Sequence, residues 1–282
     1  MSSSPPDIVA RIERLFVYPV KSCAGVELQE AVLTETGLDL DRAWMVVDAE
    51  GRFVTQRQLP RMALVRPQMK NLEVILRAPG MLALHLAIEQ VEEPVKVRVW
   101  DDEVAAYDMG AVAAQWFSDF LGARLRLVRF DPEHRRLSSL RWTAGTEALN
   151  QFSDAFALLV TGQGSLDGLN DRLAAAGHSA VGIERFRPNI HLAGLQDNDE
   201  DRLEVLRVAA CDEVQLRMVK PCARCPIPNI DPATAESSPQ VLQTLLGYRR
   251  NDRVQGAATF GMNAIVQAGA GQVLRVGQPV TR

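Results

Sequence analysis

The residue types best suited to chemistry lie in the segment Lys220–Asp231, which carries two cysteines three positions apart. Lys220 precedes the pair, and Arg224 lies between Cys222 and Cys225. A thiolate is the reactive form of cysteine, and nearby positive charges favour it. Three prolines in this segment fix the backbone and remove amide donors, which argues against a helix that begins at Cys225. The pattern therefore predicts a rigid loop carrying sulfur, a common support for a functional site.

The cysteine pair has four interpretations. A structural zinc site needs four ligands, but Cys23 and Cys211 stand alone and no histidine has ligand spacing. A thioredoxin-type dithiol normally opens a helix, whose N-terminus lowers the thiol pKa, and the prolines oppose that helix. Two thiols buried in a loop, without chemistry, are the third interpretation. The fourth is one thiolate that ligates a soft metal centre, with the other sulfur in a secondary role.

Polar groups that could hold an anion occur at three other places. Lys21 and Ser22 lie in a turn after a strand, where a cation and a hydroxyl can bind an oxyanion; a solvated turn is the alternative. Arg42 lies at the entrance of a strand, where a surface pair with a neighbouring aspartate is the alternative. A proline separates Arg187 from Asn189, so both side chains are expected to point to the same side of an extended segment. A guanidinium beside an amide suits a phosphate or the edge of a heterocycle.

Strands dominate the elements that must position these groups. Residues 8–130 form short apolar runs separated by glycine, proline and acidic turns, and only 110–121 has helical spacing. The polar segment 131–150 is expected to be a linker or mobile loop. Residues 151–282 continue with strands and a helix after Gly162, for which Ser165 is the expected N-cap. The pattern predicts a mostly β protein with some α (α+β), with domains at 8–130 and 151–282.

Size and composition are those of an ordinary globular protein. The chain has 282 residues, 47% apolar and 23% charged, which indicates one large or two small domains. The net charge of −4 argues against a nucleic-acid polymer bound by bulk electrostatics.

The cysteines and the apolar runs bear on the cellular compartment. Four unevenly spaced cysteines do not form the pattern of a disulfide framework, which favours a reducing cytoplasm. No stretch approaches the roughly 20 apolar residues of a membrane span. Residues 1–7 lack a signal-peptide pattern and are expected to be a disordered tail.

Two groups of motifs resemble one known family. The first resembles the C-terminal domain of MOSC proteins and comprises Lys220–Asp231, Leu245–Arg249, Phe260–Asn263 and Leu274–Val280. The second resembles the N-terminal β-barrel domain that accompanies MOSC and comprises Tyr18–Cys23, Asp41–Trp44 and Thr55–Arg57. Within the family the chain is most similar to the mitochondrial amidoxime reducing component and its bacterial relatives. The resemblance implies a β-barrel MOSC domain preceded by an N-terminal β-barrel domain.

The resemblance also implies roles for individual residues. In that family the second cysteine of the pair ligates molybdenum, and the matching position here is Cys225, the expected metal ligand and catalytic residue. Polar and cationic side chains of the family hold the pterin and phosphate of the molybdenum cofactor. The matching residues here are Lys21, Ser22, Arg42, Arg187 and Asn189.

The activity implied is reduction of N-hydroxylated compounds: amidoximes, hydroxylamines and N-hydroxylated bases. The cofactor (Mo-molybdopterin) would carry the redox chemistry while the protein binds and orients. The chain has no spare cysteine cluster for an iron–sulfur centre, so electrons are expected from a separate ferredoxin or flavoprotein. The family run Thr-Thr-Val-Asp-Pro-x-Thr-Gly after the ligand is replaced here by Pro226–Ala235, which predicts a different loop shape and substrate preference.

Two further functions remain open at this point. MOSC domains also occur in cofactor sulfurases, so a non-catalytic cofactor carrier or sulfur-transfer module is one alternative. The chain lacks the pyridoxal-phosphate domain of those enzymes. Pyridoxal phosphate binding is therefore an expectation that comes from the family resemblance alone. A metal-free or zinc-binding structural protein is the other alternative.

Overall fold

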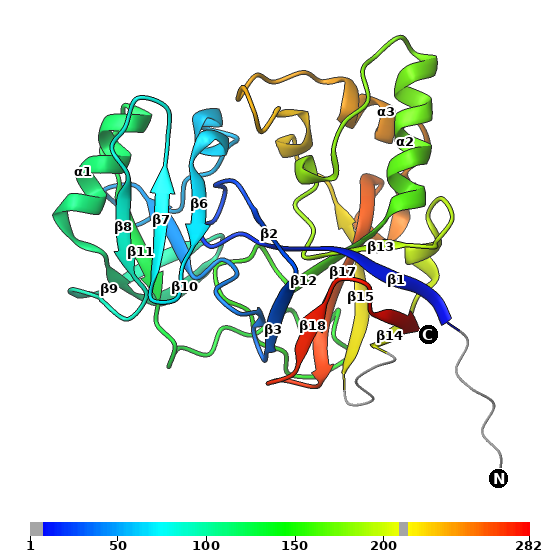
Figure 1. The fold of residues 1–282 in the computed structure, drawn as a ribbon, viewed down its shortest axis with the longest axis horizontal. Helices are drawn as coiled ribbons and strands as arrows, with labels where there is room; N and C mark the ends of the chain where they lie inside the picture. The colour runs from blue at the N-terminus through cyan, green and yellow to red at the C-terminus, as the bar shows by residue number, and fades with distance from the viewer. Residues whose placement is uncertain (1–7, 209–213) are drawn as a thin grey trace.

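A closed barrel of strands forms one part of the fold (Figure 1). The computed structural model describes residues 8–208 and 214–282, so the predictions for residues 1–7 and for Cys211 lie outside the described residues. Within the described residues, seven strands follow one another around the barrel, and β12 closes it by pairing with β17. Closure leaves no free edge in the ring. In ring order the strands are β12 (Leu158–Gly162), β13 (Ile190–Ala193), β1 (Ile8–Val17), β19 (Pro279–Thr281), β14 (Val205–Val208), β15 (Gln215–Ala223) and β17 (Ala257–Ala268).

The first strand of the chain, β1, lies in this barrel. It pairs with β13 and β19, which come from the C-terminal half of the chain. Ala10 and Ile12 are buried in the barrel core, and the pairing register then shifts before Arg14, after which Leu15 is buried. One extra residue in a strand reverses which face the following side chains occupy, which explains the imperfect alternation of the sequence here. The barrel thus draws strands from both ends of the chain, and the domain boundaries on either side of 131–150 stay a prediction.

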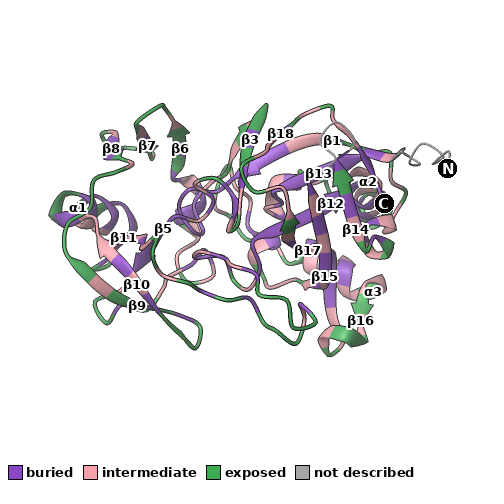
Figure 2. Ribbon diagram, turned by 90° about the horizontal axis from the view of Figure 1, so that it is seen from below, coloured by how far each residue is buried: buried purple, intermediate pink, exposed green. Residues whose placement is uncertain are grey.

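Two smaller sheets and helix α1 (Gly110–Leu121) surround a second core (Figures 1 and 2). Helix α1 has the bounds that the sequence predicts; it buries Trp116, Phe117 and Phe120, and Gly122 ends it in the left-handed conformation with φ 71°. One sheet has the order β9-β10-β11-β5 and the other β6-β7-β8. The strands are β5 (Trp44–Val47), β6 (Arg66–Met69), β7 (Glu73–Arg77), β8 (Leu84–Ala87), β9 (Pro94–Val99), β10 (Asp102–Asp108) and β11 (Arg126–Phe130).

Helices α2 (Gln163–Ala175) and α3 (Gln240–Tyr248) pack together against the barrel through a core that includes Phe186 and Phe260. The predicted N-cap is wrong: α2 begins after Gly162, and the Ser165 hydroxyl donates instead to Glu200, because that buried carboxylate lies beside the first turn. Among the described residues, no helix is both long and apolar enough to cross a membrane. The remaining elements are β2 (Val26–Leu28), β3 (Glu30–Thr34), β4 (Gly37–Leu38), β16 (Arg250–Asn251), β18 (Val273–Arg275) and the 3-10 helices η1 (Pro60–Leu64), η2 (Ile183–Arg185), η3 (Asp199–Arg202), η4 (Ile227–Asn229) and η5 (Asp252–Val254).

The segment 131–150 is anchored by Arg136. Its buried guanidinium donates to Asn150 Oδ1 and to the carbonyl oxygens of Gln151 and Ser153, each at 2.7 Å, and it pairs with Asp102 of β10 at 2.8 Å. A buried guanidinium with several acceptors fixes the segments that supply them. This contact connects the β9-β10-β11-β5 sheet to the residues that precede β12.

Glu200 of η3 is a buried carboxylate whose environment predicts a pH effect on stability. Its side chain is fully buried, Oε2 accepts the Ser165 hydroxyl at 2.6 Å, and Oε1 has no hydrogen-bond partner among the described residues. Burial raises the pKa of Glu200 from 4.5 to about 7, against the opposing effect of the Ser165 hydrogen bond. The folded protein therefore keeps a proton that the unfolded chain releases, so this group costs stability progressively as the pH rises from about 4.5 to about 7.

We expect Glu200→Gln to remove this fall in the free energy of unfolding with rising pH. At pH 8 the variant should be more stable than the parent by up to about 3 kcal/mol, and near pH 4 the two should differ little. Urea unfolding at both pH values measures the difference, with Glu204→Gln as a matched exposed control. Parallel stability curves for the parent and Glu200→Gln would contradict the assignment.

Candidate functional site

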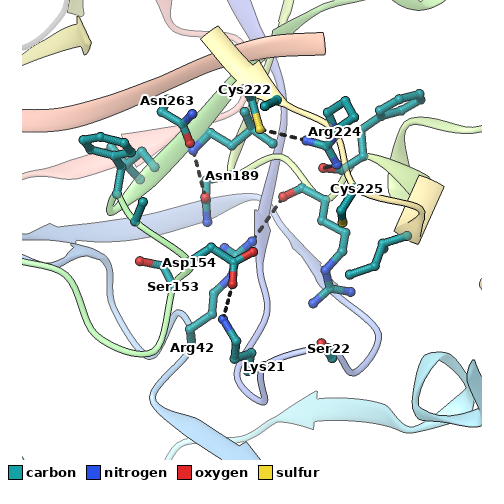
Figure 3. A pocket seen from close by; sticks show the side chains of 18 of the residues that line it. Lys21, Ser22, Arg42, Ser153, Asp154, Asn189, Cys222, Arg224, Cys225 and Asn263 are labelled. Carbon is teal, nitrogen blue, oxygen red and sulfur yellow. Dashed lines mark hydrogen bonds and ion pairs between the residues drawn. The ribbon is translucent and has the colours of Figure 1, made fainter. Parts of the chain in front are cut away.

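All six residues predicted for the site line one cavity between the barrel and the smaller sheets (Figure 3). The cavity has a volume of about 210 Å³. Its predicted wall residues come from the turn after β1, the approach to β5, the approach to β13 and the end of β15. These residues are Lys21, Ser22, Arg42, Arg187, Asn189 and Cys225. Contacts that no local pattern specifies therefore bring four distant parts of the chain to one place.

Three of these residues have the left-handed backbone conformation that non-glycine residues rarely adopt. The φ angles are 65° for Ser22, 52° for Arg42 and 58° for Arg187. Such residues cost on the order of 1–3 kcal/mol each and cluster at functional sites. The prediction of an extended Arg187 is wrong, because its left-handed φ turns the chain there and its carbonyl accepts the Arg42 guanidinium at 3.2 Å.

Two arginines stack on the buried ring of Tyr18. The guanidinium carbons of Arg42 and Arg187 lie 4.3 and 4.2 Å from the ring centroid. Arg187 also donates to the Cys23 carbonyl at 2.6 Å. Burial lowers the pKa of Arg187 to about 10, but this value is still high enough to keep the guanidinium charged at neutral pH. The expected ion pair of Arg42 with Asp41 exists, but Asp41 is buried behind the cavity wall, so this is not a surface pair. The stacking holds two cations in fixed positions.

Lys21 forms an ion pair that the sequence does not indicate. Its Nζ lies 2.6 Å from Asp154 Oδ1 and 2.7 Å from the Phe152 carbonyl. Burial lowers the pKa of Lys21, and Asp154 opposes that effect. The side chain of Asp154 is 60% exposed; partial desolvation by its neighbours acts to raise its pKa, but the charge and hydrogen bond of Lys21 outweigh this effect, so the pKa of Asp154 falls to about 2. The Asp154 carboxylate beside Lys21 is therefore ionised at neutral pH.

Asn189 has a structural task inside the barrel. Its Oδ1 accepts the Leu159 amide at 3.1 Å, and its Nδ2 donates to the Phe16 carbonyl at 3.2 Å. These bonds fix the start of β12 and the end of β1 to the residue that directly precedes β13. One Nδ2 hydrogen remains beyond these bonds, so a contact with a bound molecule is compatible with this task.

Positive charge is concentrated in the cavity wall. Among the described residues that line it, six carry a cation and one carries a carboxylate, whereas the whole chain has a net charge of −4. Such a concentration in a partly enclosed space attracts an anion. Thr55 and Ser153 add hydroxyl groups. The six cationic residues are Lys21, Arg42, Arg57, Arg187, Lys220 and Arg224, and the carboxylate is Asp154.

The sulfur side of the cavity lies opposite Lys21 (Figure 3). Cys222 lies within β15, where its Sγ accepts a hydrogen bond from Arg224 at 3.0 Å, and Cys225 follows the strand. The prediction of one loop carrying both sulfurs is wrong for Cys222, because β15 continues past Pro221 by pairing with β17 across a shift in register. A proline can occupy a strand at such an irregularity, where its missing amide hydrogen is not needed. Both thiols are free and partly accessible.

Asp231 stabilises the segment after Cys225. Its Oδ2 accepts the Arg185 guanidinium at 2.8 Å, and its Oδ1 accepts the Ala233 amide. Arg185 also donates to the carbonyl oxygens of Pro228 and Asn229. The carboxylate is thus held by its own partners, and it shapes the segment that follows Cys225.

The cationic, hydroxyl and thiol groups of the cavity wall fit an anionic organic cofactor that already carries a soft metal ion. In the part of the chain that the structure describes, no group of three or more histidine, cysteine or carboxylate side chains could hold a metal ion alone. The cations and hydroxyls suit a phosphate and polar ring edges, and a thiolate suits a soft metal. The Tyr18 hydroxyl is buried near both arginines and lacks a partner among the described residues.

Comparison with known proteins agrees with this geometry. The chain matches the MOSC N-terminal beta barrel domain over residues 9–124 and the MOSC domain over residues 148–281. It is 34% identical to mitochondrial amidoxime-reducing component 1 of Mus musculus, across 96% of this chain and 82% of that protein. It is 31% identical to mitochondrial amidoxime reducing component 2 of Rattus norvegicus, across 97% of this chain and 83% of that protein. A molybdenum cofactor sulfurase of Bos taurus is 28% identical across 86% of this chain but 29% of its own length. The chain therefore belongs to the family of MOSC proteins that includes the mitochondrial amidoxime reducing components.

Proposed function

We propose that this protein is a molybdenum-cofactor-dependent reductase of N-hydroxylated compounds. The observation that carries the proposal is one cavity with excess positive charge on its walls and a free thiol pair across from Lys21. The names of its relatives support a reductase of amidoximes and a link to the molybdenum cofactor. Amidoximes, hydroxylamines and N-hydroxylated bases share the N–OH group on which such an enzyme would act.

The residues of the chain have distinct tasks in this proposal. Lys21, Ser22 and Arg42 would hold the phosphate and pterin end of the cofactor, with Arg187 and Asn189 along its length. Cys225 would be the thiolate ligand of molybdenum and the catalytic residue. When bound, the cofactor supplies a two-electron centre that can accept an oxygen atom from a substrate. The stacking on Tyr18 keeps the two arginines in place before the cofactor enters.

The reaction consumes two electrons and two protons for each N–O bond that breaks. An amidoxime becomes an amidine, a hydroxylamine becomes an amine, and the oxygen leaves as water. We expect the electrons to come from a separate ferredoxin or flavoprotein, and we place the reaction in the cytoplasm, away from membranes and nucleic-acid polymers. Pyridoxal phosphate binding is outside this proposal.

Activity and metal content together test the proposal. The protein would be produced in a host that makes molybdenum cofactor, its molybdenum measured by mass spectrometry, and benzamidoxime offered with dithionite-reduced methyl viologen. We expect bound molybdenum and formation of benzamidine. Protein without molybdenum would contradict cofactor binding and favour a structural protein.

A second candidate is a cofactor carrier or sulfur-transfer module. The match to a molybdenum cofactor sulfurase, which spans most of this chain, favours it. Bound molybdenum without reduction of benzamidoxime, benzhydroxamic acid or N-hydroxycytosine would support this candidate and overturn the reductase.

A further inference from the structure

A second cavity of about 470 Å³ adjoins the candidate site. Arg187 and Ile227 line both cavities, and Ile227 comes two residues after Cys225. Its walls come from both parts of the fold: the turn into β2, the 3-10 helix η1 with the start of β6, and the segment 227–233. A molecule in this space would therefore lie beside the segment that carries Cys225 without occupying the cationic cavity.

Most charges around this second cavity are neutralised by neighbours. Glu27 and Glu184 share the single guanidinium of Arg14, at 2.8 and 2.6 Å, and the positive charge of Arg187 in the same lining offsets the negative charge that remains. Arg185 pairs with Asp231 at 2.8 Å, which also fixes the segment that forms one wall. Paired charges at these distances present little net field, so these walls do not select an ion.

Arg66 differs from these charges. It is exposed at the start of β6, lines the cavity, and has no carboxylate partner among the described residues. The rest of the lining is rich in small or apolar side chains that suit a flat, uncharged body. These are Ala24, Val26, Ala63, Pro67, Ile230 and Pro232.

We propose that this cavity is the substrate chamber and that it selects N-hydroxylated compounds with an apolar body and an anionic group at the end remote from the N–O bond. The N–OH group would enter past Ile227 toward Cys225, and Arg66 would bind the anionic end. The inference rests on the reductase function proposed above. Its reaction has the same balance: the N–O bond of the amidoxime breaks, two electrons and two protons enter, and amidine and water leave.

A pair of substrates that differ by one carboxylate tests this inference. Benzamidoxime and 4-carboxybenzamidoxime would be reduced with methyl viologen as electron source, so no protein donor enters the comparison. We expect the parent to prefer the carboxylate by about fivefold in kcat/KM, the range of an exposed ion pair. Arg66→Ala should remove this preference through KM with kcat unchanged, while benzamidoxime kinetics stay the same. Added salt should weaken the preference in the parent only.

Two more variants and a binding measurement sharpen the outcome. Arg77→Ala, an exposed arginine on β7 without a carboxylate partner among the described residues, should change neither substrate. Ala233→Trp should fill the chamber and raise KM for both substrates, at unchanged molybdenum content. Calorimetry should show weaker binding of the product 4-amidinobenzoate to Arg66→Ala than to the parent. Equal kinetics of Arg66→Ala and the parent on the carboxylate would overturn the chamber, whereas failure of the parent to reduce either compound would overturn the reductase function itself.

Discussion

Replacing Cys225 by serine is expected to remove benzamidoxime reduction almost completely. A hydroxyl is a poor ligand for a soft metal, and serine stays protonated at neutral pH. Loss of even an indirect partner of a metal ligand typically costs about 10–100-fold in affinity or activity, so loss of the ligand itself should exceed about a hundredfold. Activity with reduced methyl viologen and molybdenum content, measured on the same preparation, check this expectation.

Cys222→Ser is the matched control for this change. Cys222 is part of strand β15, and its sulfur accepts a hydrogen bond from Arg224. A serine hydroxyl can accept the same bond, so the wall and its charge should persist. We expect this variant to keep most of the activity and all of the metal. Equal losses of benzamidoxime reduction in both variants would instead indicate that the two thiols act together as a catalytic dithiol. Normal turnover by Cys225→Ser would refute the assigned ligand.

The chemical character of the site could be predicted because it depends on residue types that are unusual in their local patterns. A cation beside a hydroxyl at a turn and a thiol pair among prolines are each visible within a few residues. The same holds for helix α1, whose apolar spacing and terminal glycine are local signals. That these groups meet in one cavity came from the family resemblance, because the contacts between them span most of the chain.

Features that depend on long-range contacts escaped prediction. Asp154 has no distinctive neighbours in sequence, and its role appears only when Lys21 lies beside it. Strand β1 reads like any half-buried strand, so its place between β13 and β19 is not visible locally. The left-handed backbone of Arg187 is imposed by its surroundings against the preference of the residue.

The second large effect is expected for Lys21→Met, which should weaken retention of the cofactor by about 10- to 100-fold. A hydrogen bond to a charged group contributes about 1.5–3 kcal/mol, and each 1.4 kcal/mol is tenfold. Folding should suffer less, because the Lys21 side chain is 7% exposed but that of Asp154 is 60% exposed. Water can therefore solvate the carboxylate that remains. Molybdenum content after gel filtration measures retention, and thermal unfolding measures the fold.

The double variant Lys21→Met/Asp154→Asn separates direct contact from the general field of the cavity. It removes one charge of each sign, so the excess positive charge of the wall equals that of the parent. If Lys21 touches the anion itself, the double variant should retain as little cofactor as Lys21→Met. Recovery of parental retention would show that net charge alone attracts the anion, and Lys21 would lose its specific role. Asp154→Asn alone should be the least stable of the three, because it leaves the buried ammonium of Lys21 without the negative charge of its partner.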